Sequence, residues 1–434
     1  MIERYSLSPM KELWGLEAQY ERWLEVELAV VKTFEERGMA PEGTYDKLRE
    51  TAEIDVDKIL EIEEVTRHDV IAFIKGITEN MGDEARYFHM GMTSSDVVDT
   101  AWSLGMKEAM EMIIARLDEF IDVLKKGALK YKQTVTLGRT HGIHAEPTSF
   151  GLKWLSWLSE AQRSKTRLEK ALHEISQGKI SGAVGNYANI SPEVEKEALE
   201  KIGLRACECS TQVVPRDVHS EYLFALALMG ALIERISIEV RHLQKSEVQE
   251  AQEPFRKGQR GSSAMPHKKN PIISERLCGM ARLLRSNADA SVENIALWHE
   301  RDISHSSIER VIIPDSCMIA YYMLDKIIWM MDNLVVNEDQ MLITFERSFH
   351  LVYSQKVMLA LIGKGMSREE AYKMVQREAL DCWNFKSDFK DAVMNNSEIR
   401  EYLDDEEINT IFNPDGYLKN VDEIYKRFDF GELK

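Results

Sequence analysis

Apolar residues recur along much of this chain at alternating spacings of four and three, which is typical of amphipathic helices that pack along a seam. The clearest stretch runs from Val218 to Gln252, where 35 residues include no proline and a single glycine. Its seam consists of Tyr222, Leu226, Met229, Ile233, Ile236, Val240 and Leu243. The pattern predicts one continuous helix about 52 Å long.

Other stretches repeat this pattern and predict a bundle. A second seam is formed by Met106, Met110, Ile113, Leu117, Phe120, Leu124, Ala128 and Tyr131. Further helical patterns run from about Ile272 to His299 and from about Ser316 into the 330s. Because several long helices with such seams are typical of helical bundles, the expected fold class is mainly α.

Helix-start signals and chain length suggest three helical domains. Ser8-Pro9 and Ser191-Pro192 are predicted to be helix caps with proline at the first helical position, and Ser367 to Glu370 has the spacing of a capping box. At roughly 150 residues per domain, the length suggests about three domains. We expect an N-terminal helical domain over residues 1–92, a central bundle over 93–345 and a C-terminal helical domain over 346–434.

Four polar segments between the long helices are expected to be non-helical and to carry functional groups, as loops on rigid scaffolds often do. They are "GMTSSD" from Gly91, "GRTHGIHAEPTS" from Gly138, "SGAVGNYAN" from Ser181 and "GSSAMPHKKNP" from Gly261.

Charge and composition exclude several classes of function. The net charge of −18, without a broad basic face, argues against a nucleic acid partner. No segment reaches the roughly 18 apolar residues that span a bilayer, and the first residues lack the apolar core of a signal peptide. The five cysteines are odd in number and unevenly spaced, which favours a reducing, cytoplasmic location. Cys207-x-Cys209 has no second ligand pair, so no metal site is expected there.

One segment departs from this acidic background. Between Pro254 and Ser274 there is no Asp or Glu, while five basic residues lie inside it: Arg256, Lys257, Arg260, Lys268 and Lys269. Asn270-Pro271 predicts a helix start with asparagine as the cap, and a helix N-terminus attracts negative charge. The segment lacks the Walker phosphate-loop spacing. It favours anion binding, and a mobile, solvated basic loop is the structural alternative.

Histidines and arginines elsewhere are further candidates. His141 and His144 lie close in sequence, and an imidazole with a pKa of about 6.5 suits proton transfer near neutral pH. Arg301 and Arg310 have planar donor forks that suit carboxylate or phosphate. Helix caps and surface charge pairs give the same patterns, so each motif alone leaves both interpretations open. The segment "HERDISH" from His299 lacks the zinc-binding H-E-x-x-H spacing.

Taken together, the motifs resemble the fumarase/aspartase superfamily. "GSSAMPHKKNP" is similar to its signature, and "GMTSSD" and "GRTHGIHAEPT" precede it in the superfamily's order. The histidine in "MPHK", the "TRHD" segment and "WHERDISHSSIER" resemble the adenylosuccinate lyase family within it. The resemblance extends over nearly the whole chain.

The resemblance implies a mostly α, three-domain subunit with a central long-helix bundle, assembled as a homotetramer whose active sites draw on three subunits. It implies β-elimination of fumarate from adenylosuccinate, giving AMP, and from its succinyl-carboxamide counterpart SAICAR, giving AICAR. No cofactor and no metal are implied. The implied partners are these small molecules, without nucleic acid or membrane.

The resemblance also implies residue roles. An elimination of this kind needs a base, an acid and a cation. Ser262 would be the base, His141 the acid and Lys268 the cation, with Glu275 pairing with His141. His68 is a second candidate for proton transfer. The implied substrate contacts are Arg4, Tyr5, Arg67, His68, Asp69, His89, Thr93, Ser94, Gln212, Ser263, Asn270, Arg301, Ser306 and Arg310.

Three alternatives stay open on sequence alone. A 3-carboxymuconate cycloisomerase has a similar signature, although Arg4, Tyr5 and the "TRHD" segment favour a nucleotide. A structural protein with the lyase fold and no turnover is disfavoured by the intact set of Ser262, His141, Lys268 and Glu275. A helical scaffold for partner proteins explains the seams and nothing about the basic segment. The glycines around that segment also predict a lid that closes on substrate.

Overall fold

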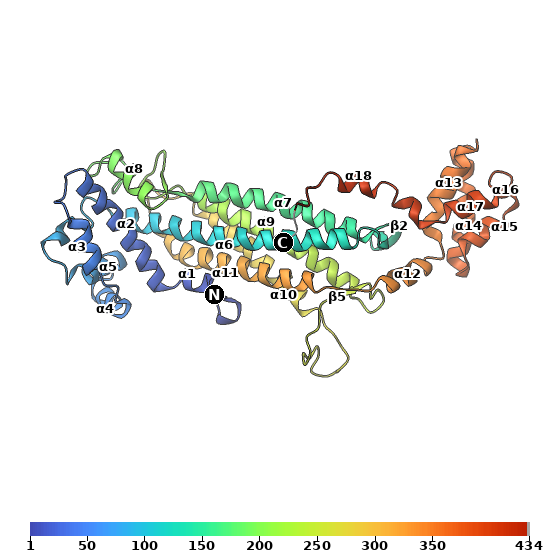
Figure 1. Cartoon of the computed structure of the whole chain (residues 1–434), viewed down its shortest axis with the longest axis horizontal. Helices are drawn as coiled ribbons and strands as arrows, with labels where there is room; N and C mark the ends of the chain where they lie inside the picture. The colour runs from blue at the N-terminus through green and yellow to red at the C-terminus, as the bar shows by residue number, and fades with distance from the viewer. Residues whose placement is uncertain (432–434) are drawn as a thin grey trace. The chain divides into compact units, whose positions relative to one another are not determined.

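The computed structural model describes residues 1–431 and is mainly α-helical (Figure 1). It divides into two compact units. The first unit consists of Met1–Asp118, Gln162–Glu234 and Leu277–Ile327, and the second consists of Glu119–Ala161, Arg235–Arg276 and Ile328–Lys434. The expected mainly α fold class is confirmed. None of the helices in residues 1–431 is both long and apolar enough to cross a membrane.

The long helices match the seams in the sequence, with corrected ends. They are α6 (Ser94–Lys130), α7 (Phe150–Ile175), α9 (Arg216–Leu243), α10 (Ile272–Glu293) and α11 (Ser304–Asp332). The prediction of a continuous helix to Gln252 was wrong, because residues 251–252 instead form β5 (Ala251–Gln252), which pairs with β6 (Val335–Val336). Helix α11 begins twelve residues earlier than predicted and continues through Pro314.

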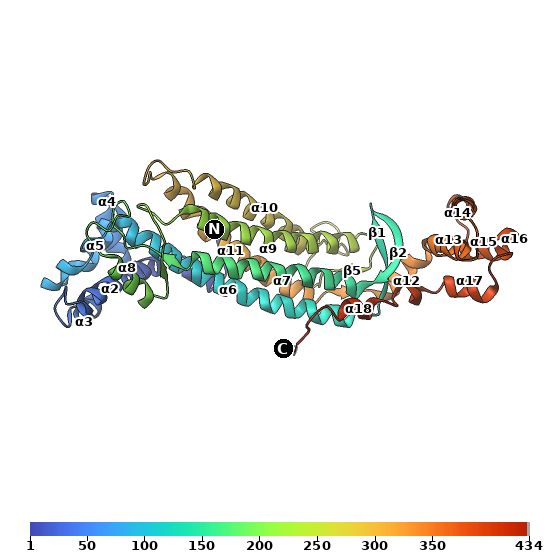
Figure 2. The same cartoon turned by 90° about the horizontal axis from the view of Figure 1, so that it is seen from above.

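The other helices of the first unit are η1 (Glu3–Tyr5), α1 (Met10–Leu13), α2 (Leu16–Glu36), α3 (Thr44–Thr51), α4 (Val56–Thr66), α5 (Asp69–Thr78), η2 (Asp83–Tyr87) and α8 (Pro192–Lys201). Buried residues of α2, α4, α5 and α8 contribute to a core that is rich in aromatic side chains. Figure 2 shows α2 to α5 gathered near α8, and Trp23 and Phe73 meet edge to face in the core with ring centroids 5.4 Å apart. Strands β3 (Gln177–Gly178) and β4 (Arg205–Ala206) form a short parallel pair.

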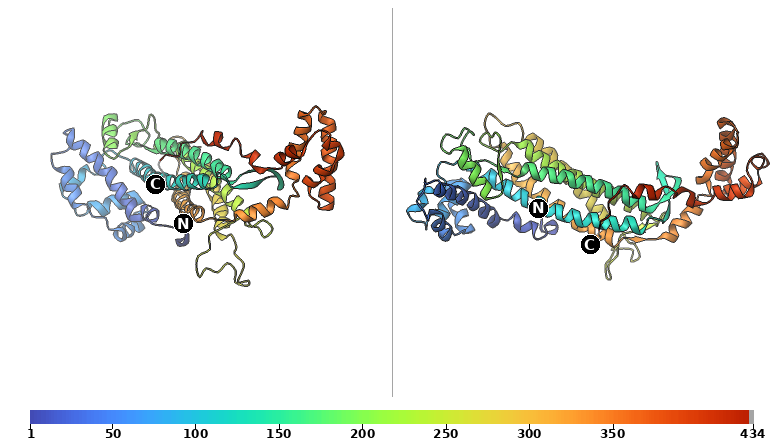
Figure 3. Two further views of the ribbon diagram at one scale, coloured as in Figure 1. Left: turned by 45° about the vertical axis from the view of Figure 1, so that its right-hand side comes forward. Right: turned by 45° about the horizontal axis from the view of Figure 1, so that its top comes forward.

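The C-terminal helices of the second unit surround a core of their own. They are α12 (Glu338–Glu346), η3 (Leu351–Tyr353), α13 (Ser354–Gly363), α14 (Arg368–Phe385), α15 (Phe389–Asn395), α16 (Ser397–Arg400), α17 (Asp405–Ile411), η4 (Pro414–Tyr417) and α18 (Val421–Tyr425). Figure 3 shows α13 to α17, in orange and red, as one cluster. Tyr353, Phe389 and Phe412 are buried at its centre.

The segment after Gly138, which was expected to be non-helical, forms a β-hairpin. Strands β1 (Val135–Thr140) and β2 (Ile143–Ser149) pair antiparallel, with a register irregularity between Leu137 and Arg139. The turn consists of His141 and Gly142, both with positive φ (55° and 79°), as a type I′ hairpin turn requires. The segment was correctly expected to be non-helical, and its strand pairing was missed.

The predicted caps have mixed outcomes. Ser191 accepts a hydrogen bond from the Val194 N–H with Pro192 at the first helical position, and the capping box at Ser367 is present. The prediction at Ser8 was wrong, because α1 begins after Pro9 and has no side-chain cap. Helix α10 begins at Ile272, so Pro271 precedes the helix and Asn270 is not its cap.

Gly127 of α6 offers a test of the helix packing in the second unit. A Cβ atom there would lie 2.1 Å from the Trp154 ring of α7. Gly127→Ala is expected to lower the melting temperature, because overpacking costs about 1–3 kcal/mol and alanine gains only roughly 1 kcal/mol over glycine in a helix. The matched control is Gly363→Ala at the end of α13, where a Cβ meets nothing within 4 Å. Equal melting temperatures for Gly127→Ala and the wild type in calorimetry would contradict this packing.

Candidate active site

The basic segment of the second unit forms a long loop between β5 and α10, which extends away from the helices in Figure 1. The loop is closed at its base, where the Asn270 side-chain amide donates to the Gly261 carbonyl oxygen at 2.8 Å. A Cβ atom on Gly261 would lie 2.0 Å from the Lys268 carbonyl oxygen, so only glycine permits this approach. The ten residues from Gly261 to Asn270 therefore form a closed loop.

A buried carboxylate caps helix α10 at the end of this loop. Glu253 accepts hydrogen bonds from the backbone N–H groups of Ile273 (3.1 Å) and Ser274 (2.6 Å) and from the Ser274 hydroxyl. Burial raises the pKa of the Glu253 carboxyl, and the hydrogen bonds from Ser274 and Ile273 offset part of that shift. The cap that sequence analysis assigned to Asn270 is thus supplied by a residue about twenty positions upstream, which no local signal indicates.

Gln244, the residue that follows α9, binds both the end of the loop and the segment that caps α10. Its side-chain N–H donates to the Lys269 carbonyl oxygen at 2.8 Å, and its side-chain oxygen accepts from the Glu253 N–H at 2.9 Å. The Arg256 guanidinium lies 4.2 Å from the centre of the Trp329 ring, which holds the other arm of the loop. The loop is therefore attached near both of its ends.

Ser262 is the residue of the loop best placed to carry negative charge. Its hydroxyl oxygen accepts hydrogen bonds from the backbone N–H groups of Ala264 (3.2 Å) and Met265 (3.1 Å). Donors directed at an oxygen stabilise its deprotonated form. Ser262 is half-buried, whereas Ser263 is exposed. The local geometry therefore distinguishes the two serines of the motif.

A cationic cleft of about 1120 Å³ lies beside the loop in the second unit. Lys268, Asn270 and Glu275 of the predicted set line it, and Ser262 and His141 do not. Further basic side chains on its walls are Arg241, His242, Lys245, His267 and Lys269. The cleft therefore combines an excess of positive charge with two carboxylates, Glu247 and the predicted Glu275, which suits an anionic ligand.

His141 lies exposed at the tip of the β-hairpin. The hairpin is held by Arg139, whose guanidinium forms a two-point ion pair with the fully buried Glu250 carboxylate, one contact being 2.9 Å. Burial and the charge of Arg139 lower the pKa of the neighbouring His144. Within residues 1–431, no hydrogen bond joins His141 to Ser262 or Glu275. A single chain therefore holds the hairpin in place but does not bring His141 into a hydrogen bond with Ser262 or Glu275.

In the first unit, a buried ion pair holds the start of α6. The Asp96 carboxylate pairs with the Lys179 ammonium group, and both side chains are fully buried. Asp96 also accepts hydrogen bonds from the backbone N–H groups of Thr93 (2.8 Å), Ser181 (3.1 Å) and Gly182 (3.2 Å). The segments "GMTSSD" and "SGAVGNYAN" are therefore joined through one carboxylate that the motif analysis did not single out.

Gln212 and Arg301 of the predicted set are in direct contact. The Gln212 side-chain N–H donates to the Ala183 carbonyl oxygen at 2.8 Å, and its oxygen accepts from Arg301 at 2.9 Å. Arg301 also donates through Nε to His305 Nε2 at 3.4 Å. The other ring nitrogen, His305 Nδ1, lies 3.0 Å from the Glu309 carboxylate and 3.1 Å from Arg216 Nη2.

Behind these residues lies a buried charge cluster that sequence analysis missed. Arg216 pairs with Asp99 and Glu309, and His219 and His305 also contact Glu309. Burial opposes ionisation of the two carboxyls, but the charge of Arg216 outweighs it at Asp99, and His219, His305 and Arg216 outweigh it at Glu309. The pKa values of both carboxyls are therefore lowered. The only sequence signal was the spacing of four between His305 and Glu309.

Other predicted substrate contacts group around α5 and α11 of the first unit. Arg310 forms an ion pair with Asp69 and donates to the Ser306 hydroxyl at 3.4 Å. His68 is the N-cap of α5, and Arg67 has positive φ (52°) at the turn before it. The "TRHD" segment is therefore the junction between α4 and α5, with Asp69 directed to Arg310.

Tyr5 and His89, two further predicted contacts, each pack against a neighbouring side chain. Tyr5 packs edge to face on Tyr322 with centroids 5.3 Å apart, next to exposed Arg4 in η1. The ring of His89 contacts the buried Glu27 carboxylate at 2.6 Å. Burial lowers the pKa of His89, but the bond and charge of Glu27 outweigh this, so its pKa is raised. Within residues 1–431, no three His, Cys, Asp or Glu side chains are arranged to hold a metal ion.

Comparison with known proteins identifies the family. The family described as "Lyase" matches residues 5–284, and that described as "Adenylosuccinate lyase C-terminus" matches residues 350–428. The chain is 55% identical to the adenylosuccinate lyase of Thermotoga maritima over 99% of this chain and all of that protein. The chain belongs to the adenylosuccinate lyase family. The family's enzyme from Bacillus subtilis is 47% identical over 98% of this chain and 99% of its own length.

Solved structures show that the fold is shared more widely than the family. A fumarate lyase from Mesorhizobium sp. BNC1 superimposes with a TM-score of 0.90 at 23% identity, covering 98% of this chain and 99% of that one. A 3-carboxy-cis,cis-muconate lactonizing enzyme from Pseudomonas putida gives 0.89 at 23% identity, covering 98% and 96%. The expected fumarase/aspartase-like fold is confirmed, as is the resemblance to the adenylosuccinate lyase family.

The buried cluster predicts a pH-dependent stability effect for Glu309→Gln. Because the native pKa of Glu309 is lowered, its ionised form stabilises the protein above the unfolded pKa of about 4.3, and this contribution is lost as the pH falls toward the native value. Leaving Arg216 without this partner should cost up to about 3–5 kcal/mol at pH 7. Denaturant unfolding at pH 7 and near pH 3 measures the difference, which should shrink in acid.

The matched control is Glu221→Gln, which breaks the exposed ion pair between Glu221 and Lys170. Exposed pairs contribute only about 0–1 kcal/mol, so this variant should unfold almost as the wild type does at both pH values. A Glu309→Gln effect as small as that of the control, or one that is equal at both pH values, would show that Glu309 is not the charged centre of the cluster.

Proposed function

We propose that this chain is an adenylosuccinate lyase, which releases fumarate from adenylosuccinate and from SAICAR by general acid/base catalysis. The observation that carries the proposal is the 55% identity over essentially the whole length of a family enzyme. The geometry of the Ser262 loop supports it independently. The similarity to a muconate lactonizing enzyme, at 23% identity, concerns the fold alone and favours no second function.

In the proposed reaction, Ser262 removes the proton from the carbon next to a carboxylate of the succinyl group. A serine hydroxyl is a weak base unless its alkoxide is stabilised. The N–H groups of Ala264 and Met265 supply two such donors, and the loop holds no acidic residue. Lys268, on the wall of the cationic cleft, stabilises the carboxylate dianion that forms when the proton leaves.

The second half of the reaction breaks the carbon–nitrogen bond. The electron pair of the dianion forms the double bond of fumarate, and the leaving nitrogen takes a proton from an acid. We assign this acid to His141, with Glu275 as the carboxylate that orients it, and keep His68 as a substrate contact and the second candidate for proton transfer. The exposed position of His141 at the hairpin tip supports the assignment, because a proton donor has to reach the substrate.

The nucleotide part of the substrate is assigned to the basic and polar residues of the first unit. Arg301, Ser306 and Arg310 have donors suited to phosphate, and the hydrogen bonds from Arg301 to Gln212 and from Arg310 to Ser306 support this assignment. The further proposed contacts are Arg4, Tyr5, Arg67, Asp69, His89, Thr93 and Ser94, with Ser263 and Asn270 in the loop.

We further propose a cytoplasmic homotetramer of three-domain subunits whose active sites are shared between subunits. Apolar side chains exposed on α9 and α10 of the first unit support association: Phe224, Leu228, Leu283 and Val292 are each 43–48% exposed. The separate family matches over residues 5–284 and 350–428 fit a domain boundary near residue 345. Free thiols at all five cysteines fit a reducing compartment.

The loop is proposed to close over bound substrate. Its attachments at Gly261, Lys269 and Arg256 fix the base, so the motion is confined to the residues between Ser262 and Lys268. Closure would exclude water and bring the Ser262 hydroxyl to the substrate.

Ser262→Ala is expected to reduce turnover of adenylosuccinate by at least about 10²-fold, because it removes the proposed base and keeps the backbone donors. The fall in ultraviolet absorbance on conversion to AMP measures the rate, and circular dichroism checks the fold. Ser397→Ala, at an exposed serine of the second unit, is the matched control and should keep wild-type turnover. Unchanged turnover in Ser262→Ala would reject the assignment of the base, and inactivity of the wild type would reject the function.

Separate His141→Gln and His68→Gln variants distinguish the two candidate acids. Loss of a general acid should lower kcat by about 10²–10⁴-fold with little change in KM and should remove the alkaline limb of the pH profile. Loss of a substrate contact should mainly raise KM. We expect the first result for His141→Gln and the second for His68→Gln, measured from pH 5 to 9. The reverse pattern would exchange the two roles.

A further inference from the structure

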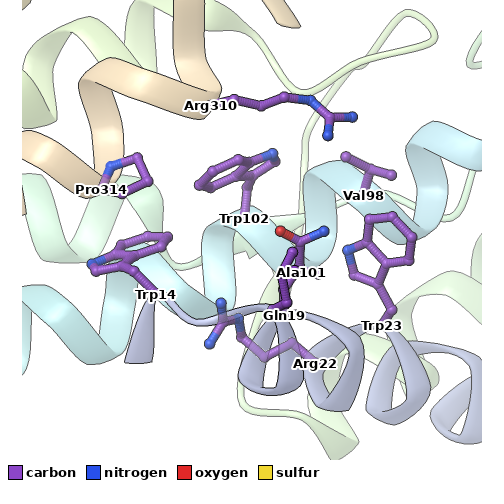
Figure 4. Close-up of a pocket in the computed structure, with 10 residues that line it drawn as sticks. Trp14, Gln19, Arg22, Trp23, Val98, Ala101, Trp102, Arg310 and Pro314 are labelled. Atoms are coloured by element: carbon purple, nitrogen blue, oxygen red, sulfur yellow. The ribbon is translucent and has the colours of Figure 1, made fainter. Parts of the chain in front are cut away.

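A cavity of about 270 Å³ lies in the first unit between α2, α6 and α11 (Figure 4). The rings of Trp14, Trp23 and Trp102 form much of its wall, and Val98 and Ala101 add apolar contacts. The cavity has room for about nine waters at ~30 Å³ each, slightly less than pockets that hold drug-sized ligands. Its size therefore suits a small organic molecule.

Arg22 places a cation on this wall that is paired with no carboxylate in the described part of the chain, although Glu21 and Glu108 line an adjoining pocket with it. Its guanidinium lies 5.6 Å from the centre of the Trp14 ring and donates to the Leu13 carbonyl oxygen at 2.9 Å. Among residues 1–431 it forms no ion pair with a carboxylate. Burial lowers the pKa of Arg22, and the nearby charges of Glu108 and Glu21 offset this only in part. A cation removed from water normally meets an anion, so this group lacks its expected partner.

The other polar groups on the wall are also donors or neutral. The Trp14 indole nitrogen has almost no accessible surface, so the ring and not its N–H faces the cavity. Figure 4 shows the Gln19 amide directed into the space between Trp102 and Trp23, and Arg310 on the opposite side. No Asp or Glu of the described chain lines the cavity. The wall therefore offers indole faces and hydrogen-bond donors and supplies no negative charge of its own.

The position of Arg22 depends on a glycine in α6. A Cβ atom on Gly105 would lie 3.1 Å from Arg22 Nε and 3.3 Å from the edge of the Trp14 ring. Both side chains therefore rest directly on the backbone of α6. Arg22 and Trp14 are therefore held by their neighbours: Gly105 lies beside both, Leu13 accepts from Arg22, and the Trp102 ring lies against Trp14 with centroids 5.5 Å apart.

We propose that this cavity binds a planar organic anion, an aromatic ring system that carries a carboxylate. The ring would pack against the indoles, and the carboxylate would accept hydrogen bonds from Arg22. This site is separate from the residues to which the base, the acid and the dianion-stabilising cation were assigned. It adjoins the proposed nucleotide contacts only through Arg310, so the test is designed to exclude binding there.

The test is isothermal titration calorimetry of the full chain with 2-naphthoate, in the presence of saturating AMP to occupy the proposed nucleotide site. We expect one bound naphthoate per chain, with an affinity at least about tenfold higher than that of neutral 2-naphthol, since a hydrogen bond to a charged group is stronger than one between neutral groups. No binding, or equal binding of the two probes, would overturn the proposal.

Variants locate the bound probe. Arg22→Met removes the charge, keeps the length of the side chain and should weaken naphthoate binding about tenfold or more, whereas Arg22→Lys should retain part of it. Trp14→Phe reduces the aromatic surface of the wall and should weaken binding severalfold. The control Arg49→Met removes an exposed arginine that pairs with Glu25 and should bind as the wild type does. Wild-type affinity in folded Arg22→Met would place the probe elsewhere and overturn the proposal.

Measuring turnover distinguishes a failure of the cavity proposal from a failure of the proposed function. Arg22→Met is expected to convert adenylosuccinate at the wild-type rate, because Arg22 has no part in the proposed reaction. If the wild type shows no turnover, the proposed function fails, and the calorimetry, repeated without AMP, still decides whether the cavity binds the anion.

Discussion

A charge removed from water has to meet an opposite charge or several hydrogen-bond donors, and this requirement organises the first unit. Asp96 and Asp99 lie one turn apart on α6, both buried. Asp96 meets Lys179 and three backbone N–H groups, and Asp99 meets Arg216. Gln212 and Arg301 are then fixed against the segment that Asp96 holds. The proposed substrate contacts therefore take their positions from buried ion pairs that do not themselves reach a ligand.

The same requirement acts in the second unit through the segment from Gln244 to Glu253. Glu250 pairs with Arg139 and holds the hairpin that carries His141, while Glu253 caps α10 and Gln244 binds the end of the Ser262 loop. These contacts are possible only because α9 ends at Leu243. A helix continued to Gln252, as the absence of proline suggested, would direct Gln244 and Glu250 to different faces. The apolar seam itself ends at Leu243, and the prediction failed beyond it, where two carboxylates are buried.

The features that were predicted from sequence are those with local signals. Seams at spacings of three and four predict the long helices because each contact needs only the neighbouring turn, and Ser191 and Ser367 cap helices within three residues of themselves. The pairing of Asp96 with Lys179 spans 83 residues, and a single sequence contains no signal for it. The hairpin had a local signal, the glycine of a two-residue turn, but its strand pairing was not predicted. Ser262 was found through resemblance, and the two backbone donors on its hydroxyl were not predictable.

Neither unit of a single chain contains all the residues that the proposed elimination needs. The first unit holds the arginines suited to phosphate and none of the residues assigned to the base, the acid or the dianion. The second unit holds those residues, yet no hydrogen bond within residues 1–431 joins His141 to Glu275, although a histidine that donates a proton needs a partner to hold its orientation. The apolar side chains exposed on α9 and α10 require cover as well. Association of several copies would meet both requirements at once, because a neighbouring copy supplies a second hairpin and a second apolar face. On this argument the shared active site and the oligomer are one prediction, and a chain held monomeric would be expected to fold and to lack turnover.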